Sequence, residues 1–317
     1  MPKAFARYAA AVLAFNLAVI LWGAFVRVTG SGAGCGNHWP LCNGVVMPLA
    51  PAWATIVEFT HRAMSGIDVL AVGVLLVWAF RAFPRRHPVR LGAALSAVFL
   101  ASEAAIGAAL VKLEHVARNA SVGRGYSLSG HLANTLTLLA CLTLTVWWAA
   151  GGPPLRVRGK AAWLAAASLL LFAILGISGA IAALGDTLFP ARSLAEGFRQ
   201  DFDPAANIFL RLRLLHPLLA VVTAAWLGFY ATLNRRAGWP AWTLLALVAS
   251  QITAGVVNLL LLAPAAMQLV HLLLADLVWI ALVLLGASTL QGPAVPADRV
   301  GDAMAPRVDR LERVGPN

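Results

Sequence analysis

Eight long apolar segments constrain this sequence more than any other feature. Each is on the order of 20 residues, the length that an α-helix needs to cross the hydrocarbon core of a bilayer. The expected spans lie near residues 8–27, 54–80, 91–111, 128–149, 161–184, 208–233, 240–262 and 266–289. Of the 317 residues, 60% are hydrophobic and 12% are charged, which is far from the composition of a soluble domain. The sequence therefore predicts an all-α integral membrane protein with eight transmembrane helices.

Lysine and arginine residues predict how these spans are oriented. They concentrate at the start of the chain, in the connections after the second, fourth and sixth apolar runs, and in the tail. All of these segments fall on one side of the membrane, and the side rich in Lys and Arg is the cytoplasmic one. We therefore expect a multi-pass protein of the bacterial inner membrane with both termini in the cytoplasm. The net charge of +11 then reflects contact with the lipid bilayer, and we expect no binding to nucleic acid.

A weak internal repeat divides the apolar part of the chain. Leu100-Ala101-Ser102-Glu103 in the third span resembles Val248-Ala249-Ser250-Gln251 in the seventh, and Gly23-Ala24 in the first resembles Gly179-Ala180 in the fifth. Four spans return the chain to the side from which it started, so two such copies run in the same direction. The sequence therefore predicts two pseudo-repeated four-helix bundles.

The repeat defines the expected units of the chain. We expect one bundle at residues 1–150, a second at residues 151–290, and a disordered cytoplasmic tail at residues 291–317. The segment Gly151–Pro154, which contains two Gly and two Pro, joins the bundles. The tail is polar and of mixed charge, a composition that cannot bury enough apolar surface to fold.

Four of the seven histidines indicate a cofactor. His61, His131, His216 and His271 lie one in each even-numbered span, all near the external end. We expect His61 to face His131 and His216 to face His271, each pair clamping one metal centre across a bundle. Two imidazoles without further soft ligands suit haem iron better than structural zinc, which takes four ligands. The other three histidines, His38, His87 and His115, lie in loops, where we expect them to be solvated.

Charged residues near these histidines distinguish the two halves. Glu58 precedes His61 by one helical turn and shares its face, whereas the matching position before His216 is Arg213. Ionisable groups inside a span mark functional sites, so we expect Glu58 to make only the first site reactive. Arg62, Arg211 and Arg213 are candidate contacts for haem propionates, with lipid headgroups as the alternative partners.

Three further acids lie inside spans. Asp68, Glu103 and Asp276 are each either satisfied structural groups or parts of a proton route. We favour the structural interpretation, because none of them stands at a fixed spacing from a second charge.

The cysteines divide between one loop and one span. Cys35 and Cys42 share the first external loop, and that compartment is oxidising in bacteria, so we expect a disulfide between them. The bond is either a structural staple or a redox-active pair. Cys141 lies within an apolar run and is expected to behave as a small hydrophobic residue.

Two motifs resemble those of the haem A synthase family. The first is Gly30–Gly44, GSGAGCGNHWPLCNG, and the second is Glu58-Phe59-Thr60-His61-Arg62. Together with eight spans and four histidines, the resemblance covers nearly all of the chain except the tail. It implies an oxidoreductase that converts the C8 methyl group of haem O to a formyl group by successive hydroxylation, giving haem A for terminal oxidases.

The resemblance also implies roles for individual residues. His61 and His131 would bind the iron of the substrate haem O, with Glu58 as the essential catalytic acid. His216 and His271 would hold a permanent haem B. Cys35 and Cys42 match the external cysteine pair of the family, while the second pair that some members carry in the fifth-to-sixth loop is missing from this sequence.

The same resemblance implies partners. Haem O synthase, a farnesyltransferase, would act upstream, and terminal oxidase assembly factors would act downstream. The sequence identifies no electron donor, and it leaves open whether the chain forms a homo-oligomer.

Two other functions fit part of the pattern. A two-haem electron-transfer cytochrome with bis-histidine ligation would share the four ligands but would give Glu58 no role. A two-repeat transporter would carry intramembrane acids, but its repeats more often contain spans broken by Gly or Pro near the midplane. Such breaks are not evident in this sequence.

Overall fold

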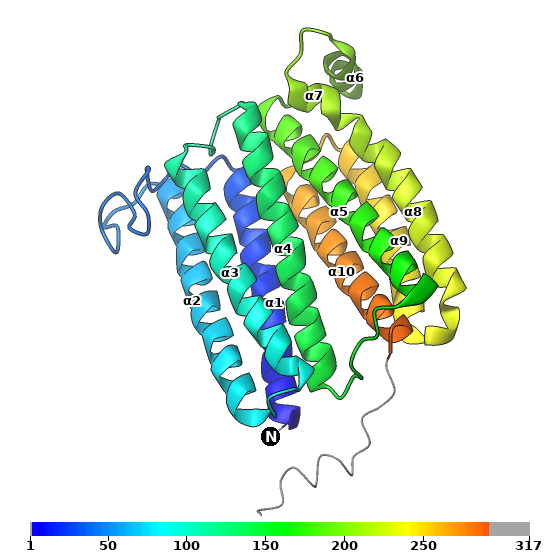
Figure 1. Cartoon of the computed structure of the whole chain (residues 1–317). Coiled ribbons are helices and arrows are strands. Elements are labelled where there is room, and N and C mark those ends of the chain that lie inside the picture. The colour runs from blue at the N-terminus through cyan, green and yellow to red at the C-terminus, as the bar shows by residue number, and fades with distance from the viewer. Residues whose placement is uncertain (1, 292–317) are drawn as a thin grey trace, which may run out of the picture.

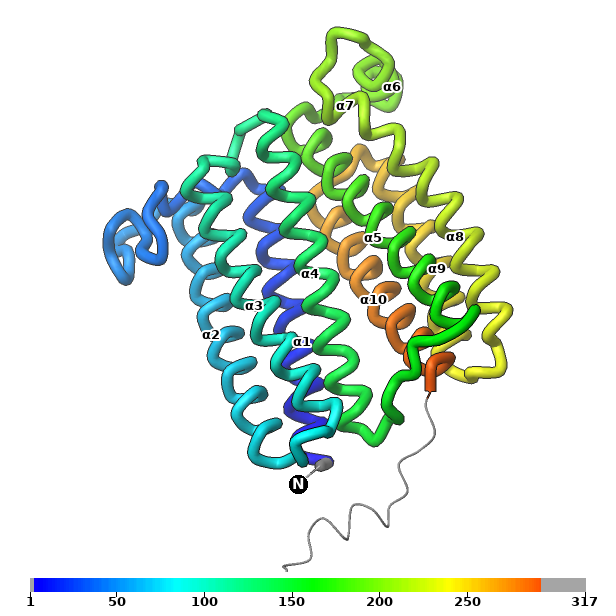
Figure 2. Tube along the Cα trace, in the orientation of Figure 1, coloured from blue at the N-terminus to red at the C-terminus, as the bar shows by residue number. Residues whose placement is uncertain are grey.

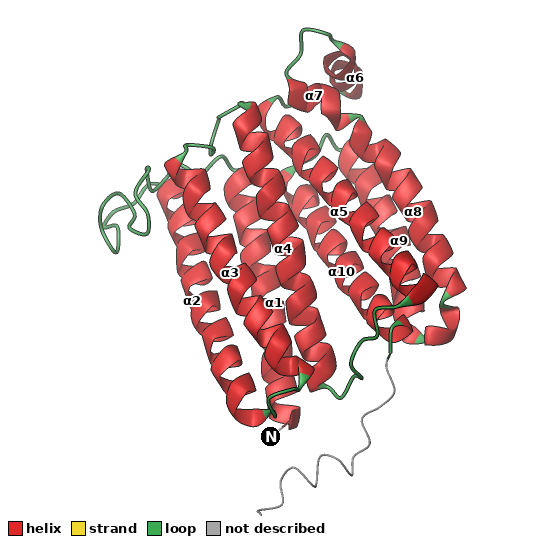
Figure 3. Ribbon diagram, in the orientation of Figure 1, coloured by secondary structure: helices red, strands yellow, loops and turns green. Residues whose placement is uncertain are grey.

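The computed structural model describes residues 2–291, and over that range the chain consists of helices joined by loops (Figure 3). The helices are α1 (Pro2–Val28), α2 (Trp53–Ala82), α3 (Pro88–Lys112), α4 (Val122–Ala149), α5 (Gly159–Leu188), α6 (Leu194–Phe202), α7 (Ile208–Arg213), α8 (Leu215–Leu233), the short 3₁₀ helix η1 (Arg235–Ala237), α9 (Trp239–Leu260) and α10 (Ala265–Thr289). The predicted tail beyond residue 291 lies outside the described residues.

Within residues 2–291, eight helical segments are long and apolar enough to cross a membrane. Seven of them are the single helices α1, α2, α3, α4, α5, α9 and α10, and the eighth, Ile208–Leu233, is formed by α7 and α8 together. The prediction of eight spans in an all-α protein is confirmed. The sequence predicted a sixth span at residues 208–233 with its helix distorted by Pro217, and the helix is interrupted at Leu214 between α7 and α8. Pro217 explains the interruption, because it has no N–H to donate to the carbonyl four residues earlier.

The long helices pack as two groups of four. Helices α1 to α4 contact one another in the first group, and α5, α8, α9 and α10 do so in the second (Figure 1). The groups meet where α4 packs against α5 and α10, and where α1 packs against α10. The tube in Figure 2 shows the two groups side by side, with their helices running roughly parallel.

The two ends of this assembly differ in character. One end, here called the basic end, carries the start of α1 and the connections α2–α3, α4–α5 and α8–α9 (Figure 1). The opposite end, called the histidine end, carries the connections α1–α2, α3–α4, α5–α8 and α9–α10, and the four intramembrane histidines lie towards it. The basic loops of the sequence therefore gather at one end, and the candidate ligands lie towards the other.

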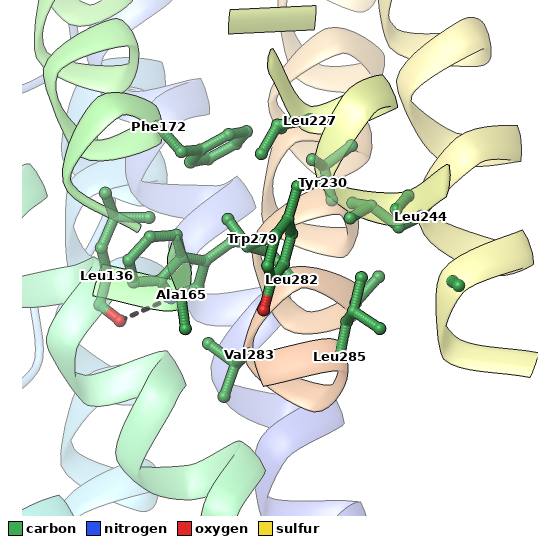
Figure 4. Packing of buried hydrophobic residues seen from close by; sticks show 14 of the residues in the cluster. Leu136, Ala165, Phe172, Leu227, Tyr230, Leu244, Trp279, Leu282, Val283 and Leu285 are labelled. Atoms are coloured by element: carbon green, nitrogen blue, oxygen red, sulfur yellow. Dashed lines mark hydrogen bonds between the residues drawn. The ribbon is translucent and has the colours of Figure 1, made fainter. Parts of the chain in front are cut away.

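Both apolar cores lie towards the basic end. In the first group, Phe5, Leu75 and Leu142 are among the fully buried side chains. In the second group, Tyr230 and Leu282 belong to a cluster that also includes residues of α4 (Figure 4). Because side chains of α4 enter both cores, this helix is the shared wall of the two groups.

A hydrogen bond fixes the contact between the groups within this core. The indole N–H of Trp279 in α10 donates to the carbonyl oxygen of Leu136 in α4 at 2.7 Å (Figure 4). A buried indole N–H needs such a partner. Packing is therefore tight at the basic end, while the side chains around the histidines are less completely buried.

The contact between α3 and α4 depends on Gly92. A Cβ atom at this position would meet Thr145 Oγ1 and would lie 3.1 Å from Cζ3 of Trp148. We expect Gly92→Ala to push α3 away from α4 and to lower the free energy of unfolding by about 1–3 kcal/mol, measured by thermal unfolding in detergent.

Gly73→Ala is the matched control for this prediction. Gly73 lies in α2, and nothing from another helix lies within 4 Å of an added Cβ. Because Gly is unfavourable inside a helix, this variant should be as stable as the original chain or more so. Equal losses in the two variants would contradict the close α3–α4 packing.

Candidate functional site

The four intramembrane histidines project from α2, α4, α8 and α10 near the histidine end, and each is half-buried. His216 and His271 lie next to each other, with their ring centres 6.3 Å apart and their planes at 87°. In the first group, His61 projects from α2 and His131 from α4. The fold thus brings the second predicted pair close together, and the pairing of His61 with His131 stays a prediction.

The spacing of His216 and His271 fits one metal ion between two imidazoles. Each metal–nitrogen bond is about 2 Å long and the nitrogen is about 1 Å from the ring centre, so two rings sharing a metal have centres about 6 Å apart. The described residues contain no group of three or more His, Cys, Asp and Glu side chains that could hold a metal. A donor set of two imidazoles is the set that a haem iron takes from a protein, because the porphyrin supplies the other ligands.

The ring nitrogens of the four histidines differ in their partners. Nδ1 of His61, His131 and His271 is buried and makes no hydrogen bond with the described residues, whereas Nδ1 of His216 lies 3.1 Å from Ser178 Oγ. Buried polar atoms normally have partners. The rings of His61, His131 and His271 are therefore not held by hydrogen bonds from Nδ1 to the described residues.

Glycines on neighbouring helices make room for three of the rings. A Cβ atom would lie 2.9 Å from the His61 ring if added at Gly23, and 2.8 Å from the His216 ring if added at Gly179. At Gly255, it would lie 3.0 Å from the His271 ring. Distances of this size are too short for carbon atoms in van der Waals contact. The histidines therefore pack directly against the backbones of α1, α5 and α9.

Glu58 is buried one turn before His61, and both of its carboxylate oxygens have partners. Oε1 accepts hydrogen bonds from Nη2 and Nε of Arg62 at 2.6 and 3.2 Å. Oε2 accepts a hydrogen bond from the backbone N–H of Cys35 at 2.9 Å. The sequence predicted an acid beside a ligand, and the structure adds that this acid ties α2 to the cysteine loop, defined here as residues 29–52.

Arg62 completes this connection. Its Nη1 donates to the carbonyl oxygens of His38 and Leu41, both at 2.6 Å. All three guanidinium nitrogens are therefore engaged by Glu58 or by the cysteine loop. These hydrogen bonds hold the cysteine loop on the end of α2. A contact between Arg62 and a haem propionate stays a prediction.

The disulfide between Cys35 and Cys42 is present, as predicted, and both residues are buried. Two further hydrogen bonds fix the backbone beside it, because Thr55 Oγ1 and Asn43 Nδ2 both donate to the carbonyl oxygen of Gly34, at 2.7 and 3.1 Å. The first part of the cysteine loop is thereby fastened to α2 close to Glu58. Cys141 is free and buried.

Arg213 plays a similar part in the second group. Its Nη1 lies 2.7 Å from Asp186 at the end of α5, and its Nη2 lies 2.6 Å from Asp201 in α6. It also donates to the carbonyl oxygen of Gly197 at 3.2 Å. Arg213 thus links α6 to the end of α5 and to its own helix, α7. Arg211 is exposed.

Two arginines were not singled out from the sequence. Arg27 in the last turn of α1 donates to the carbonyl oxygen of Ala183 at 2.9 Å and to Gln268 Oε1 at 3.1 Å, so it links α1 to α5 and α10. Arg124 donates to the carbonyl oxygens of Ala117 and Asn119. Both lie at the ends of apolar runs, where arginines are ordinarily interfacial, and only the fold shows that Arg27 is half-buried and Arg124 buried.

Two of the loop histidines, His87 and His115, are less solvated than predicted. His87 caps α3, with Nδ1 accepting the N–H of Val89 at 3.3 Å, and burial lowers its pKa. Nδ1 of His115 lies 2.8 Å from Ser127 Oγ. Both imidazoles are half-buried because they close the ends of helices.

The acids inside the spans differ in their partners. Asp68 is buried and accepts a hydrogen bond from Asn16 at 2.6 Å. Asp276 is buried in α10, and its Oδ2 has no hydrogen-bond partner among the described residues. Glu103 lies beside His131, with Oε1 3.5 Å from Nδ1. No local pattern connected Glu103 with His131, because the two residues come from different helices.

Comparisons with known proteins assign a family to nearly the whole chain. Residues 6–283 match a family described as cytochrome oxidase assembly protein. A protein of Thermus thermophilus named protoheme IX farnesyltransferase is 48% identical over 297 residues, which is 90% of this chain and 48% of that protein. The chain thus spans about half the length of that relative.

Shorter matches connect the chain to proteins named heme A synthase. One from Exiguobacterium sp. is 37% identical over 111 residues, which is 35% of this chain and 37% of the relative. Another from Geobacillus kaustophilus is 40% identical over 111 residues, which is 35% of each chain.

The contacts of Arg62 predict the effect of removing it. Arg62→Ala would leave the buried Glu58 without its cation and would free the carbonyl oxygens of His38 and Leu41. We expect a loss of about 1–3 kcal/mol in the free energy of unfolding, together with faster proteolysis of the cysteine loop. Arg211→Ala is the control, because Arg211 is exposed, and it should leave both readouts unchanged. Unchanged proteolysis in Arg62→Ala would show that the guanidinium does not hold the loop.

Proposed function

The chain belongs to the cytochrome oxidase assembly protein family, and on that premise we propose that it is a haem A synthase. This enzyme would be a membrane oxidoreductase that converts the C8 methyl group of haem O into a formyl group by successive hydroxylation. The family match over residues 6–283 carries the proposal. The relatives named heme A synthase support the choice of reaction.

The two histidine pairs would serve different haems. His61 and His131 would bind the iron of haem O, because Glu58 stands in this half and has no acidic counterpart before His216. His216 and His271 would hold haem B, and their ring separation of 6.3 Å supports this assignment. When bound, haem B would supply one-electron redox chemistry.

The two groups of helices would be repeats that run in the same direction, at residues 1–150 and 151–290. Matched contacts support this proposal. Gly23 of α1 faces His61 and Gly179 of α5 faces His216, so the first helix of each group touches the histidine of the second. These are the glycines that the sequence repeat aligns.

Each hydroxylation with water, R–CH3 + H2O → R–CH2OH + 2 H+ + 2 e−, needs an external acceptor for two electrons, and Glu58 would act on the water that attacks the methyl carbon once it is oxidised. A carboxylate has about four acceptor positions, and hydrogen bonds from Arg62 and Cys35 use three of them. The remaining position, on Oε2, could bind a water molecule. Glu58 would take up the proton of that water or stabilise the positive charge that develops on the carbon. Loss of water from the doubly hydroxylated carbon would then give the aldehyde.

The proposed setting is the bacterial inner membrane, with both termini in the cytoplasm. The basic loops gathered at the end where α1 starts support this orientation. A protohaem IX farnesyltransferase would supply haem O, and the name of the Thermus thermophilus relative supports that link. The family description supports a place in the assembly of terminal oxidases.

The first test of the proposal is the identity of the pigments. Purified protein should contain haem B together with haem O, a hydroxylated haem or haem A, identified by extraction and mass spectrometry. His131→Ala should lose the haem O-derived pigments and keep haem B, while His271→Ala should do the reverse. Haem B as the only pigment would point to an electron-transfer cytochrome, and a protein without haem would point to transport.

The second test addresses Glu58. Glu58→Gln keeps one acceptor oxygen, which can serve Arg62 or the N–H of Cys35 but not both, so haem content should persist although the cysteine loop loses one of its ties to this residue. Formation of haem A should fall by about 100-fold or more, measured by pigment analysis after expression with a haem O source. Glu114→Gln, at an exposed loop residue, is the control. Full haem A production in Glu58→Gln would remove this residue from the mechanism.

A further inference from the structure

A polar cluster between α3 and α4 surrounds Glu103. Oε1 of Glu103 accepts a hydrogen bond from Thr135 Oγ1, and Oε2 accepts one from Asn134 Nδ2. Asn134 is itself held, since its Oδ1 accepts from Ser102 and its Nδ2 also donates to the carbonyl oxygen of Phe99 at 2.9 Å. The carboxylate is therefore fixed in place by neutral donors, with no Lys or Arg paired to it among the described residues.

This fixed carboxylate faces the ring of His131. Its Oε1 lies 3.5 Å from Nδ1, and that nitrogen is buried without a hydrogen bond to the described residues. Thr135 Oγ1 also lies 2.9 Å from the carbonyl oxygen of His131, so its single proton is shared between this oxygen and Glu103 and the same side chain contacts both residues. A small rotation of the ring brings Nδ1–H within normal hydrogen-bond distance of the carboxylate.

The second group has a neutral amide at the matching place. Gln251, which the repeat aligns with Glu103, has its Nε2 3.4 Å from Nε2 of His271. The Gln251 Oε1 atom is buried and unpartnered. The two histidine pairs thus differ in the charge of this side chain and in the ring nitrogen that it meets, which is Nδ1 of His131 but Nε2 of His271. This difference is independent of the contrast between Glu58 and Arg213.

We propose that Glu103 is a positioning residue that orients His131 and makes it a more electron-donating ligand than His271. By accepting Nδ1–H, the carboxylate would hold the ring in the tautomer that leaves Nε2 free for iron. An anionic partner on the far nitrogen also raises the basicity of a ligating imidazole, which favours the oxidised metal. The haem at His61 and His131 therefore has the lower reduction potential of the two. This inference rests on the haem ligation in the proposed function.

Reciprocal variants test the proposal in the full-length purified protein with the haems that it retains. Glu103→Gln removes the charge beside Nδ1 of His131, and Gln251→Glu adds a charge beside His271. Reduction potentials are measured by optical redox titration, and His271→Ala shows which transition belongs to which centre. Glu103→Gln should raise the potential of the His131 centre alone and should weaken haem retention there by about 10-fold or more. Gln251→Glu should lower the potential of the His271 centre.

The possible results separate this inference from the proposed function. If both haems remain and neither variant moves a potential, Glu103 has no influence on its ligand and the inference is wrong, while the assignment as haem A synthase stands. If Glu103→Gln does not retain its haem, Glu103→Asp decides, because it keeps the charge but withdraws it from Nδ1 of His131; an unmoved potential at that centre would contradict the inference. A protein that binds no haem at either site would contradict the proposed function and the inference with it.

Discussion

The structure depends on how polar side chains are satisfied inside helices that are otherwise apolar. A buried polar or charged group without a partner is costly, and no water is available in a hydrocarbon layer to supply one. The chain meets this constraint by separating its two ends. Towards the basic end, apolar side chains pack into two cores joined through α4. Towards the histidine end, imidazoles, acids and arginines bind one another, the backbone and the loops.

Charged residues at the histidine end share one structural task. Glu58 and Arg213 occupy corresponding places in the two groups and carry opposite charges, yet each fastens an outer segment to the end of a membrane-length helix. Glu58 does so through the cysteine loop, and Arg213 through α6. Arg27 extends the same principle across the interface between the groups. The catalytic role proposed for Glu58 therefore belongs to a residue that also holds the architecture of its site.

Local patterns allowed some features to be predicted and hid others. Apolar runs are contiguous in sequence, so the spans were predicted nearly to their ends, and Pro217 signalled the distorted helix around His216. Partners such as Cys35 N–H with Glu58, or Thr135 with Glu103, come from different helices or loops. Their proximity depends on how helices are rotated about their axes and packed, which no local pattern encodes. For the same reason, Arg62 was assigned to propionates or headgroups and its loop contacts were missed.

The sequence by itself determined that the chain is helical, that it has eight apolar spans and that four histidines lie towards one end of them. Length and hydropathy decide these properties, because a bilayer accepts only helices of a certain length and composition. Tertiary structure alone decided which side chains meet: His216 with His271, Glu58 with Arg62 and the cysteine loop, and Glu103 with His131. Contacts between distant segments arise only when helices pack, since packing fixes the face that each helix turns towards its neighbours.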